Sequence, residues 1–258
     1  MNRHIDFEGI ENFRDFGGYD TACGRGLKRG VLYRSANHAR ATDADLEALK
    51  ALGVSVIVDL RRPIERQREP SRRWADFAGQ VIENDIDGGY QDWADALKEV
   101  AAIGPDWFRQ DGLSFYHKAP YEPRHLDLFA RYFRALAETD GAVVVHCAAG
   151  KDRTGMLCAF TQHLAGVHRD DILADYLLTN DEVRILRRME TFGPWLRDLT
   201  GQVIADEALR AALSVAPEYL EQAFARIEAE HGGLDRYLDE ALGLDSDLRE
   251  RLEARLLG

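Results

Sequence analysis

The sequence has few of the features that mark membrane, secreted or metal-binding proteins. No apolar run approaches 18 residues, so we predict no membrane-spanning helix. The first 18 residues are polar and acidic and lack the apolar core of a signal peptide. Only three cysteines occur, with no CxxC pair, so we expect neither a disulfide framework nor a metal site. A reducing cytoplasm is the simplest setting, with signal-independent export left open.

Positive charge is also scarce. Lysine and arginine total 33 against 45 aspartates and glutamates, which gives a net charge of −12. Such a surface repels nucleic acid and anionic membranes, so we expect neither as a partner. An anionic ligand would need a positive field confined to its site. The 45% hydrophobic and 30% charged composition is typical of a globular protein, and the length fits a single domain over residues 1–258.

Apolar runs typical of strands alternate with helical patterns in the first part of the chain. Thr42 and Asp45 have the spacing of a helix N-cap, and Gly53 stands where that helix would end. The alternation predicts an α/β fold with a central, mostly parallel sheet flanked by helices. The expected strands cover residues 31–33, 54–60, 80–85 and 142–147, and the expected helices between them cover 44–52 and 125–139.

Two segments depart from this alternation. Residues 86–122 are long for a connection between strands, so we interpret them as a helical lid or insertion. They contain the amphipathic stretch DWADALKEVAAI (92–103). After Arg153 the pattern is helical to the end of the sequence, and residues 206–258 are predicted to form a helical C-terminal part with three helices.

The stretch VVVHCAAGKDRTG (143–155) concentrates reactive side chains at the end of an apolar run. Five residues separate Cys147 from Arg153, a spacing that Cys23 and Arg29 share by chance. The context distinguishes the two, because only the loop after Cys147 leads from a predicted strand into a predicted helix. That order brings the positive end of a helix to the loop, where it favours bound anions.

The residues of this loop suit an anion cradle. Its successive backbone N–H groups could point at one site, and Gly150 would permit the tight turn. Arg153 would offer two parallel donors to an oxyanion, and the same field would lower the pKa of Cys147 and make it a nucleophile. Thr154 would donate its hydroxyl to the sulfur, and His146 would brace the loop. The residues assigned to substrate binding are Ala148, Ala149, Gly150, Lys151, Thr154 and Arg61.

The stretch HCAAGKDRTG (146–155) resembles the signature loop of cysteine-dependent protein tyrosine phosphatases. More narrowly, GKDRTG is similar to the bacterial branch related to the mycobacterial secreted B-type phosphatase, which also acts on phosphoinositides. The resemblance continues in the right order along nearly the whole chain. The stretches that carry it are NFRDFGGY (12–19), YRSA (33–36), VIVDLR (56–61), DYLLTN (175–180) and PEYLEQAF…HGGLDRYL (217–238).

The resemblance implies a phosphomonoester hydrolase that works in two steps. Cys147 attacks phosphorus and forms a phosphocysteine while an acid protonates the leaving oxygen, and water then hydrolyses the intermediate. No metal or other cofactor is implied, because Arg153 and the loop amides stabilise the transferred charge. The implied substrates are phosphotyrosine proteins and, through the charge of Lys151, phosphoinositides. We expect a monomer.

The identity of the acid is open between two regions. In the branch that the chain resembles, it is the aspartate inside the loop, here Asp152, which we favour. Many other tyrosine phosphatases use an aspartate on a separate mobile loop, and Asp85, Asp87 and Asp92 are the candidates by that analogy. Alternatively, Asp152 pairs with Lys151 or a loop amide and only shapes the cradle.

Several other residues have two interpretations. Asp59 and Arg61 end a predicted strand at the edge where α/β sites form, so Arg61 could contact substrate or both could brace the loop. The segment RRPIERQREPSRR (61–73) has six arginines against two glutamates, and this excess could steer an anion or form a solvated face. Cys158 is expected in the core, and Cys23 is expected to keep an ordinary thiol.

Two other functions would use a similar thiolate cradle. One is a sulfur- or arsenate-handling enzyme, although such enzymes rarely need the string Asp152–Arg153–Thr154. The other is a non-catalytic module that binds phosphate, against which the intact pair of Cys147 and Arg153 argues.

Overall fold

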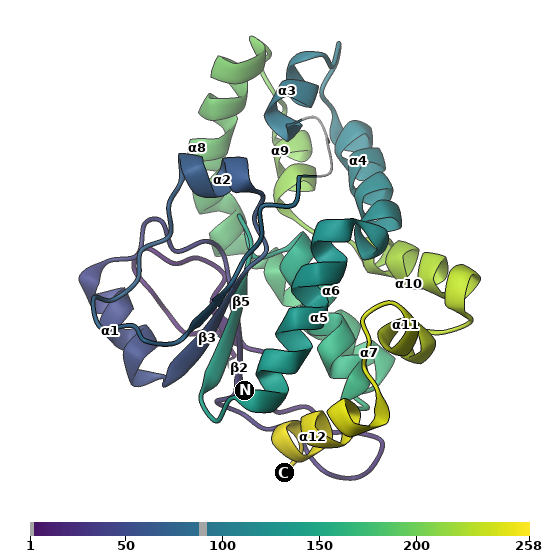
Figure 1. The fold of residues 1–258 in the computed structure, drawn as a ribbon. Coiled ribbons are helices and arrows are strands. Elements are labelled where there is room, and N and C mark those ends of the chain that lie inside the picture. The colour runs from purple at the N-terminus through teal and green to yellow at the C-terminus, as the bar shows by residue number, and fades with distance from the viewer. Residues whose placement is uncertain (1–2, 88–91) are drawn as a thin grey trace.

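A five-stranded sheet forms the centre of the computed structural model, which describes residues 3–87 and 92–258. The strand order is β1-β2-β5-β3-β4, and all neighbours are parallel except β1 and β2 (Figure 1). This confirms the predicted α/β fold with a mostly parallel sheet. The strands are β1 (Arg14–Asp15), β2 (Leu32–Ser35), β3 (Val54–Asp59), β4 (Gln80–Ile82) and β5 (Ala142–His146).

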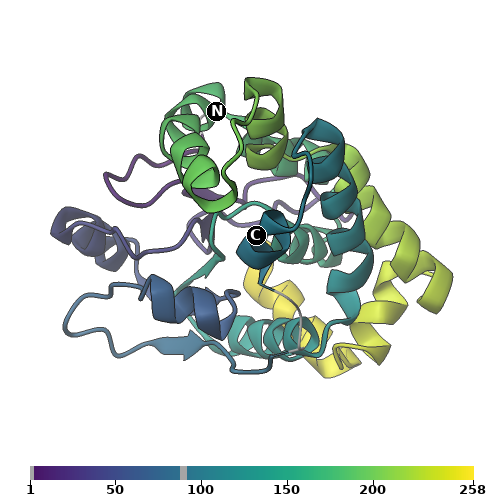
Figure 2. The same ribbon diagram turned by 90° about the horizontal axis from the view of Figure 1, so that it is seen from above.

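Helices cover both faces of the sheet and one of its ends (Figures 1 and 2). None of those in the described ranges is long and apolar enough to cross a membrane. The helices are α1 (Asp43–Ala51), α2 (Pro63–Arg68), α3 (Trp93–Lys98), α4 (Pro105–Lys118), α5 (Pro123–Glu138), α6 (Asp152–Leu164), α7 (Arg169–Leu177), α8 (Glu182–Thr200), α9 (Asp206–Leu213), α10 (Pro217–His231), α11 (Leu234–Glu240) and α12 (Ser246–Leu256).

The middle strand, β5, is buried on both faces, because its side chains alternate between two hydrophobic clusters. Val143 and Val145 pack in the larger cluster, with α5, α6 and the C-terminal helices. Val144 packs in the smaller cluster, with α1. The predicted N-cap of α1 is confirmed. Thr42 Oγ1 accepts from the Asp45 amide at 3.1 Å, and Asp45 Oδ2 accepts from the Thr42 amide at 3.0 Å.

The register of the sheet brings three polar residues to one edge. His146 ends β5 and stands between Ser35 of β2 and Asp59 of β3. Parallel strands present their carboxyl ends on the same edge of a sheet, and sites of α/β proteins form there. The loops that follow β2, β3 and β5 therefore meet above His146.

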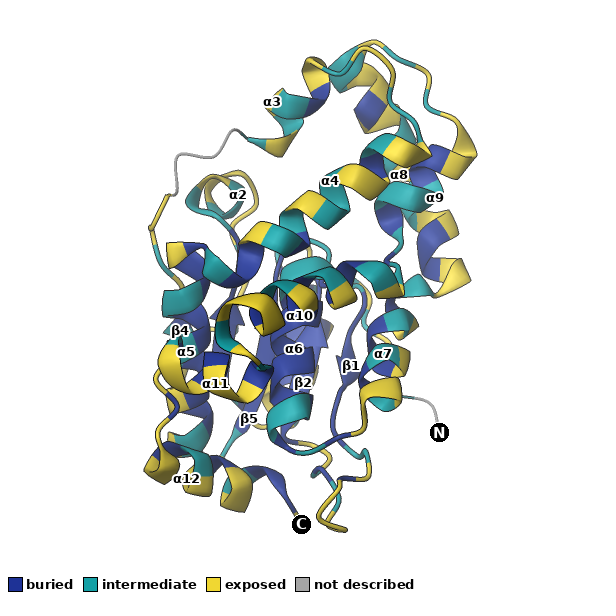
Figure 3. Ribbon diagram, turned by 90° about the vertical axis from the view of Figure 1, so that its right-hand side faces the viewer, coloured by how far each residue is buried: buried dark blue, intermediate teal, exposed yellow. Residues whose placement is uncertain are grey.

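Four helices, α3, α4, α8 and α9, lie together beyond this edge, and we call them the cap (Figures 1 and 2). The cap has a hydrophobic cluster of its own, apart from the two that cover the sheet. Its outer surfaces are largely exposed, whereas the sheet is buried (Figure 3). The buried members of its cluster are Leu97, Phe108, Leu196, Ala208 and Leu209.

The helical segments differ from the sequence-based prediction in several places. The predicted lid, 86–122, supplies α3 and α4 to the cap, but α8 and α9 lie outside it, and residues 88–91 are not among the described ones. α3 stops at Lys98, and α4 was not predicted. Gly112 obscured α4 in the sequence; it is required because a Cβ there would lie 2.9 Å from the Tyr219 ring. Residues 206–258 hold four helices, α9 to α12, where three were expected.

Candidate active site

The loop Cys147–Arg153 leads from β5 into the first turn of α6. Cys147 lies at the base of the loop and is 2% exposed. Gly150 has a φ of +65°, and a Cβ there would lie 2.3 Å from the Ser35 carbonyl oxygen, so only glycine lets the loop pass so close to the end of β2. The strand–loop–helix order predicted around Cys147 is therefore present.

Side chains from outside the loop hold its carbonyl groups. Asn37 Nδ2 donates to the Ala148 oxygen at 3.2 Å. Asn12 Nδ2 and Arg34 Nη2 both donate to the Gly150 oxygen, at 3.0 and 2.9 Å. A planar trans peptide points its N–H away from its C=O, so the amides that follow these carbonyls face the opposite way. The N–H groups of Ala149 and Lys151 therefore face away from these outside donors, which is the orientation that an anion cradle requires.

A buried charge network supports these contacts from behind. Arg34 Nη1 lies 3.3 Å from Asp175 Oδ2, and Arg14 Nη2 donates to the Asp175 carbonyl at 3.0 Å. Arg14 Nη1 also donates to Asn12 Oδ1 at 2.5 Å, which fixes the Asn12 amide toward the loop. These residues lie in stretches that carry the family resemblance, but no motif in the sequence marks them as part of the site.

Arg153 is held by Glu65, a residue that the sequence analysis also missed. Nη1 and Nη2 of Arg153 donate to the two carboxylate oxygens of Glu65 at 2.6 and 2.8 Å, and Nη1 also donates to the Leu60 oxygen at 3.2 Å. Burial raises the pKa of Glu65, but the charge of Arg153 outweighs burial and lowers it to about 2. The one signal in the sequence is that Pro63 and Glu65 suit the first turn of α2.

Asp152 stands at the start of α6 with 28% of its side chain exposed. The Tyr116 hydroxyl donates to Oδ1 of Asp152 at 3.3 Å. Lys151 Nζ lies 3.6 Å from Oδ2, so the predicted alternative of an ion pair between the two is also present. The Lys151 amine donates to the carbonyls of Ala212 and Ser214, at 2.6 and 3.2 Å, and so connects the loop to the end of α9.

The aspartates proposed as alternative acids lie in the segment after β4. Asp85 pairs with Arg66 at 2.5 Å, and 88% of its side chain is exposed. Asp92 caps α3 through the Ala94 amide at 2.9 Å and pairs with Arg68. Asp87 likewise has an interaction partner. Neither Asp85 nor Asp92 contacts the described residues of the loop through a hydrogen bond or ion pair.

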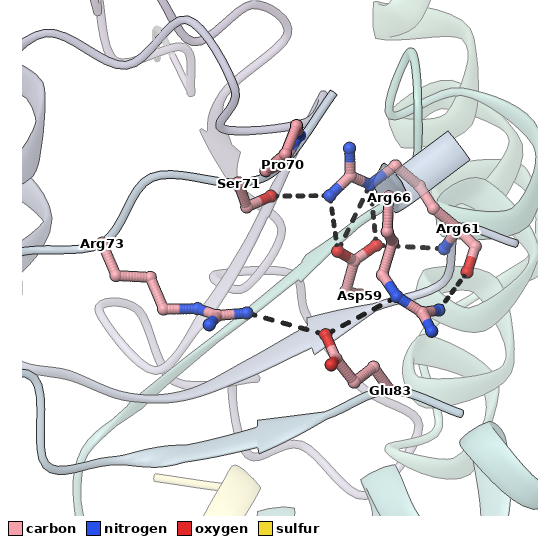
Figure 4. Close-up of a pocket in the computed structure, with 7 residues that line it drawn as sticks. All are labelled: Asp59, Arg61, Arg66, Pro70, Ser71, Arg73 and Glu83. Carbon is pink, nitrogen blue, oxygen red and sulfur yellow. Dashed lines mark hydrogen bonds and ion pairs between the residues drawn. The ribbon is translucent and has the colours of Figure 1, made fainter. Parts of the chain in front are cut away.

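Asp59, Arg61 and His146 form a buried support beside the loop, and Figure 4 shows the contacts between the first two. Arg61 Nε and Nη2 donate to the Asp59 carboxylate at 2.9 and 2.7 Å, and its other contacts are to Ser71 and a backbone oxygen. His146 lies 3.7 Å from Asp59 and stacks on His38 at 4.5 Å. Burial raises the pKa of Asp59, but His146 and Arg61 outweigh it and lower that pKa. Of its two predicted roles, Arg61 has the contacts of a brace.

The arginine-rich segment 61–73 is extensively ion-paired. Glu83 lies within 4 Å of both Arg66 and Arg73, and these three residues line a pocket of about 160 Å³ together with Asp59 and Arg61 (Figure 4). Further along, the segment pairs with Asp43 of α1 and with Asp92, the N-cap of α3. These pairs favour the second interpretation of the segment, a solvated face, over a field that steers anions.

Two expectations about the sulfur chemistry need correction. The buried Thr154 hydroxyl has no hydrogen-bond partner among the described residues, so the predicted bond to the Cys147 sulfur is not formed. Cys23 is exposed, and its thiol is not ordinary: hydrogen bonds from Thr21 and Arg25 lower its pKa to about 7. Cys158 lies in the core as expected, and burial raises its pKa to about 12.

The arrangement combines a buried thiol, an arginine held by a carboxylate, a loop whose carbonyls are held from outside, and the partly exposed carboxyl group of Asp152. Within residues 3–87 and 92–258, no cluster of three or more histidine, cysteine, aspartate or glutamate side chains could hold a metal ion. Such a cradle suits a tetrahedral oxyanion and its attack by a thiolate.

The comparisons with known proteins agree with this class of site. The chain belongs to the tyrosine phosphatase family, whose pattern matches residues 5–258, and it is an enzyme of the protein tyrosine phosphatase type. It is 34% identical over 95% of its length to a protein of Cupriavidus necator named provisionally as a tyrosine-protein phosphatase, of which the match covers 86%. It is 30% identical over 98% of its length to the triple specificity protein phosphatase PtpB of Mycobacterium tuberculosis, of which the match covers 99%.

Proposed function

We propose that the enzyme hydrolyses phosphotyrosine through a phosphocysteine formed at Cys147. The observation that carries this proposal is the loop over a buried cysteine, with its Ala148 and Gly150 carbonyls held by side chains from outside the loop and Arg153 held by Glu65 at its end. The phosphate oxygens would lie among the loop amides and accept two parallel bonds from the Arg153 fork.

In the first step, the Cys147 sulfur attacks phosphorus in line with the bond to the phenolic oxygen. The S–P bond forms as the P–O bond breaks, and the leaving oxygen takes the proton of Asp152. Glu65 keeps the Arg153 guanidinium in one orientation, which makes the charge stabilisation preorganised.

In the second step, a water molecule attacks the phosphocysteine from the side that the phenol has left. The Asp152 carboxylate takes a proton from this water, and the S–P bond breaks to release inorganic phosphate and the thiolate. The same carboxyl group thus acts first as acid and then as base.

Trapping of the intermediate tests the proposal. Enzyme quenched in acid during turnover of a ³²P-labelled phosphotyrosine peptide should carry label on Cys147 in the wild type and none in Cys147→Ser. Cys23→Ser, which alters an exposed thiol, is the matched control and should keep both label and turnover. Labelled Cys147→Ser enzyme would contradict the mechanism, and an unlabelled wild type without turnover would favour a non-catalytic phosphate-binding module.

We also propose phosphoinositides as a second substrate class. Lys151 supports this, because its amine lies at the rim of the cradle beside Asp152 and could meet a further phosphate on a substrate. Lys151→Ala should reduce phosphoinositide hydrolysis more than phosphotyrosine hydrolysis, whereas Lys98→Ala on the exposed end of α3 should reduce neither. Equal losses on both substrates would mean that Lys151 only fastens α9 to the loop.

A further inference from the structure

A pair of buried tyrosines stands behind the carboxyl group of Asp152. Tyr116, near the end of α4, is 0% exposed and donates to Asp152 Oδ1 at 3.3 Å. Its hydroxyl oxygen also lies 2.7 Å from that of Tyr176, at the end of α7, which is 1% exposed. The mechanism proposed above uses neither tyrosine.

The hydrogens of the two hydroxyls can be assigned by counting donors. Each tyrosine has one hydroxyl proton, and an ionised carboxylate can only accept. When Asp152 is ionised, the Tyr116 proton is directed to it, and Tyr176 then donates to Tyr116. Burial raises the pKa of both tyrosines well above the usual value, which keeps both hydroxyls protonated as donors. The chain therefore runs from Tyr176 to Tyr116 to Asp152.

The packing around the tyrosines fixes the position of both rings. A Cβ at Gly155 would lie 2.8 Å from two carbons of the Tyr176 ring, so Tyr176 reaches this place only because α6 has a glycine there. Tyr219 stacks on Tyr116 with ring centroids 5.8 Å apart, and Gly112 leaves the space for it. Rings held in this way cannot turn their hydroxyls elsewhere without repacking the core.

Charged groups also face Asp152, but they fix its direction less well. Lys151 lies 3.6 Å away and is held mainly by the end of α9. Arg153, Asp111 of α4 and Arg184 of α8 interact with it electrostatically over longer distances. A point charge stabilises a carboxylate in many orientations, whereas a hydrogen bond selects one.

We propose that Tyr116 is a positioning residue for Asp152 and that Tyr176 sets the direction of the Tyr116 proton. The inference rests on the proposed role of Asp152 as general acid and base. The Tyr116 hydroxyl holds Oδ1, which leaves Oδ2 to carry the proton to the leaving oxygen. Once that proton has gone, the same hydroxyl stabilises the carboxylate until it takes a proton from water.

α7 supports the cradle and the acid through adjacent residues. Asp175 binds Arg34, which holds the Gly150 carbonyl, and Tyr176 binds Tyr116, which holds Asp152. A displacement at the end of this helix would therefore disturb both phosphate binding and proton transfer.

Leaving-group dependence tests the proposal. Tyr116→Phe keeps the ring and removes the hydroxyl, so kcat for phenyl phosphate should fall roughly 10-fold, the usual worth of a hydrogen bond to a charged group. The loss for p-nitrophenyl phosphate should be smaller, since nitrophenolate needs less protonation to leave. Tyr176→Phe should give the same pattern with a smaller amplitude. Tyr132→Phe, which removes a buried hydroxyl bound to Thr161 away from the site, is the control and should keep both rates.

A second set of variants separates this inference from the proposed acid. In an Asp152→Asn background, Tyr116→Phe should have almost no further effect, because the group that it positions can no longer transfer a proton. Equal losses of Tyr116→Phe on both substrates, or losses that add to those of Asp152→Asn, would overturn the positioning role. If Asp152→Asn itself shows no dependence on the leaving group, the proposed acid is wrong.

Discussion

The cradle and the cap are built in different ways. Side chains from three other parts of the fold hold the carbonyls of the loop at 147–153, and the loop stands on a core that extends from Phe16 to Leu257. The cap has a small cluster of its own and leaves large side chains such as Trp93 and Trp195 partly exposed. The cradle, which holds the preorganised donors, is therefore supported by many buried contacts. The cap is supported by fewer.

One helix belongs to both regions, and it shows how they are joined. Phe108 in α4 packs in the cap, whereas Tyr116 at the other end packs in the main core and contacts Asp152. Lys151 makes a second connection, from the loop to α9. If the chemical step depends on the cradle and access of the substrate depends on the cap, the effects of substitutions in the two regions should differ in kind as well as in size.

The largest expected effect is at the arginine of the cradle. Arg153→Lys keeps a positive charge but loses the planar fork that meets both Glu65 and two phosphate oxygens. We expect kcat for p-nitrophenyl phosphate to fall roughly 10³-fold or more. Arg68→Lys, on the exposed pair with Asp92, is the matched control and should keep its rate. A loss below tenfold for Arg153→Lys would mean that positive charge alone suffices.

The next largest effect concerns stability. Arg34→Met leaves the Asp175 carboxylate buried with one arginine fewer and the Gly150 carbonyl without that donor, and we expect a loss of about 3–5 kcal/mol. Arg109→Met removes an exposed pair between Arg109 of the cap and Glu218 of α10, and we expect a loss of about 0–1 kcal/mol. Urea unfolding measures both. Similar losses would show that the cradle is no more tightly supported than the cap.

The Glu65–Arg153 pair makes the free energy of unfolding depend on pH. The pKa of Glu65 is lower in the folded chain, about 2, than its ordinary value of 4.5. Its contribution to stability is therefore complete above pH 4.5 and is lost as the pH falls toward 2. Between pH 5 and pH 3, the wild type should lose more unfolding free energy than Glu65→Gln, by an amount on the order of 2 kcal/mol. Parallel losses in urea unfolding would contradict the assignment.

The features that could be predicted from the sequence depend on residues that are close to one another along the chain. The N-cap of α1 at Thr42, the buried run of β5 and the turn at Gly150 follow from local backbone chemistry. The last two locate the loop at the end of a strand. The supporting pairs could not be found in this way. Glu65 and Arg153 are 88 positions apart, and Arg34 and Asp175 are 141 apart. Only the tertiary fold brings such residues together.

The smallest expected effect tests the cap from its exposed side. Trp195 on α8 is 42% exposed and stacks on Phe192, with ring centroids 5.5 Å apart, and on Trp93 at 6.4 Å. An aromatic contact of this kind contributes about 0.5–1.5 kcal/mol. If the exposed face of Trp195 makes one such contact with a phosphotyrosine peptide, Trp195→Ala should raise KM for that peptide about tenfold or less. It should leave kcat for p-nitrophenyl phosphate unchanged, because that substrate is small enough to need the cradle alone.

A matched variant and the opposite result complete this test. Val203→Ala, at an 81% exposed position between α8 and α9, should change neither constant. A fall in kcat for p-nitrophenyl phosphate in Trp195→Ala, with KM for the peptide unchanged, would assign the cap a part in the chemical step. The division between a catalytic cradle and a cap that governs access would then be wrong, and Tyr116 and Lys151, which join the two, would be the routes by which Trp195 reaches Asp152.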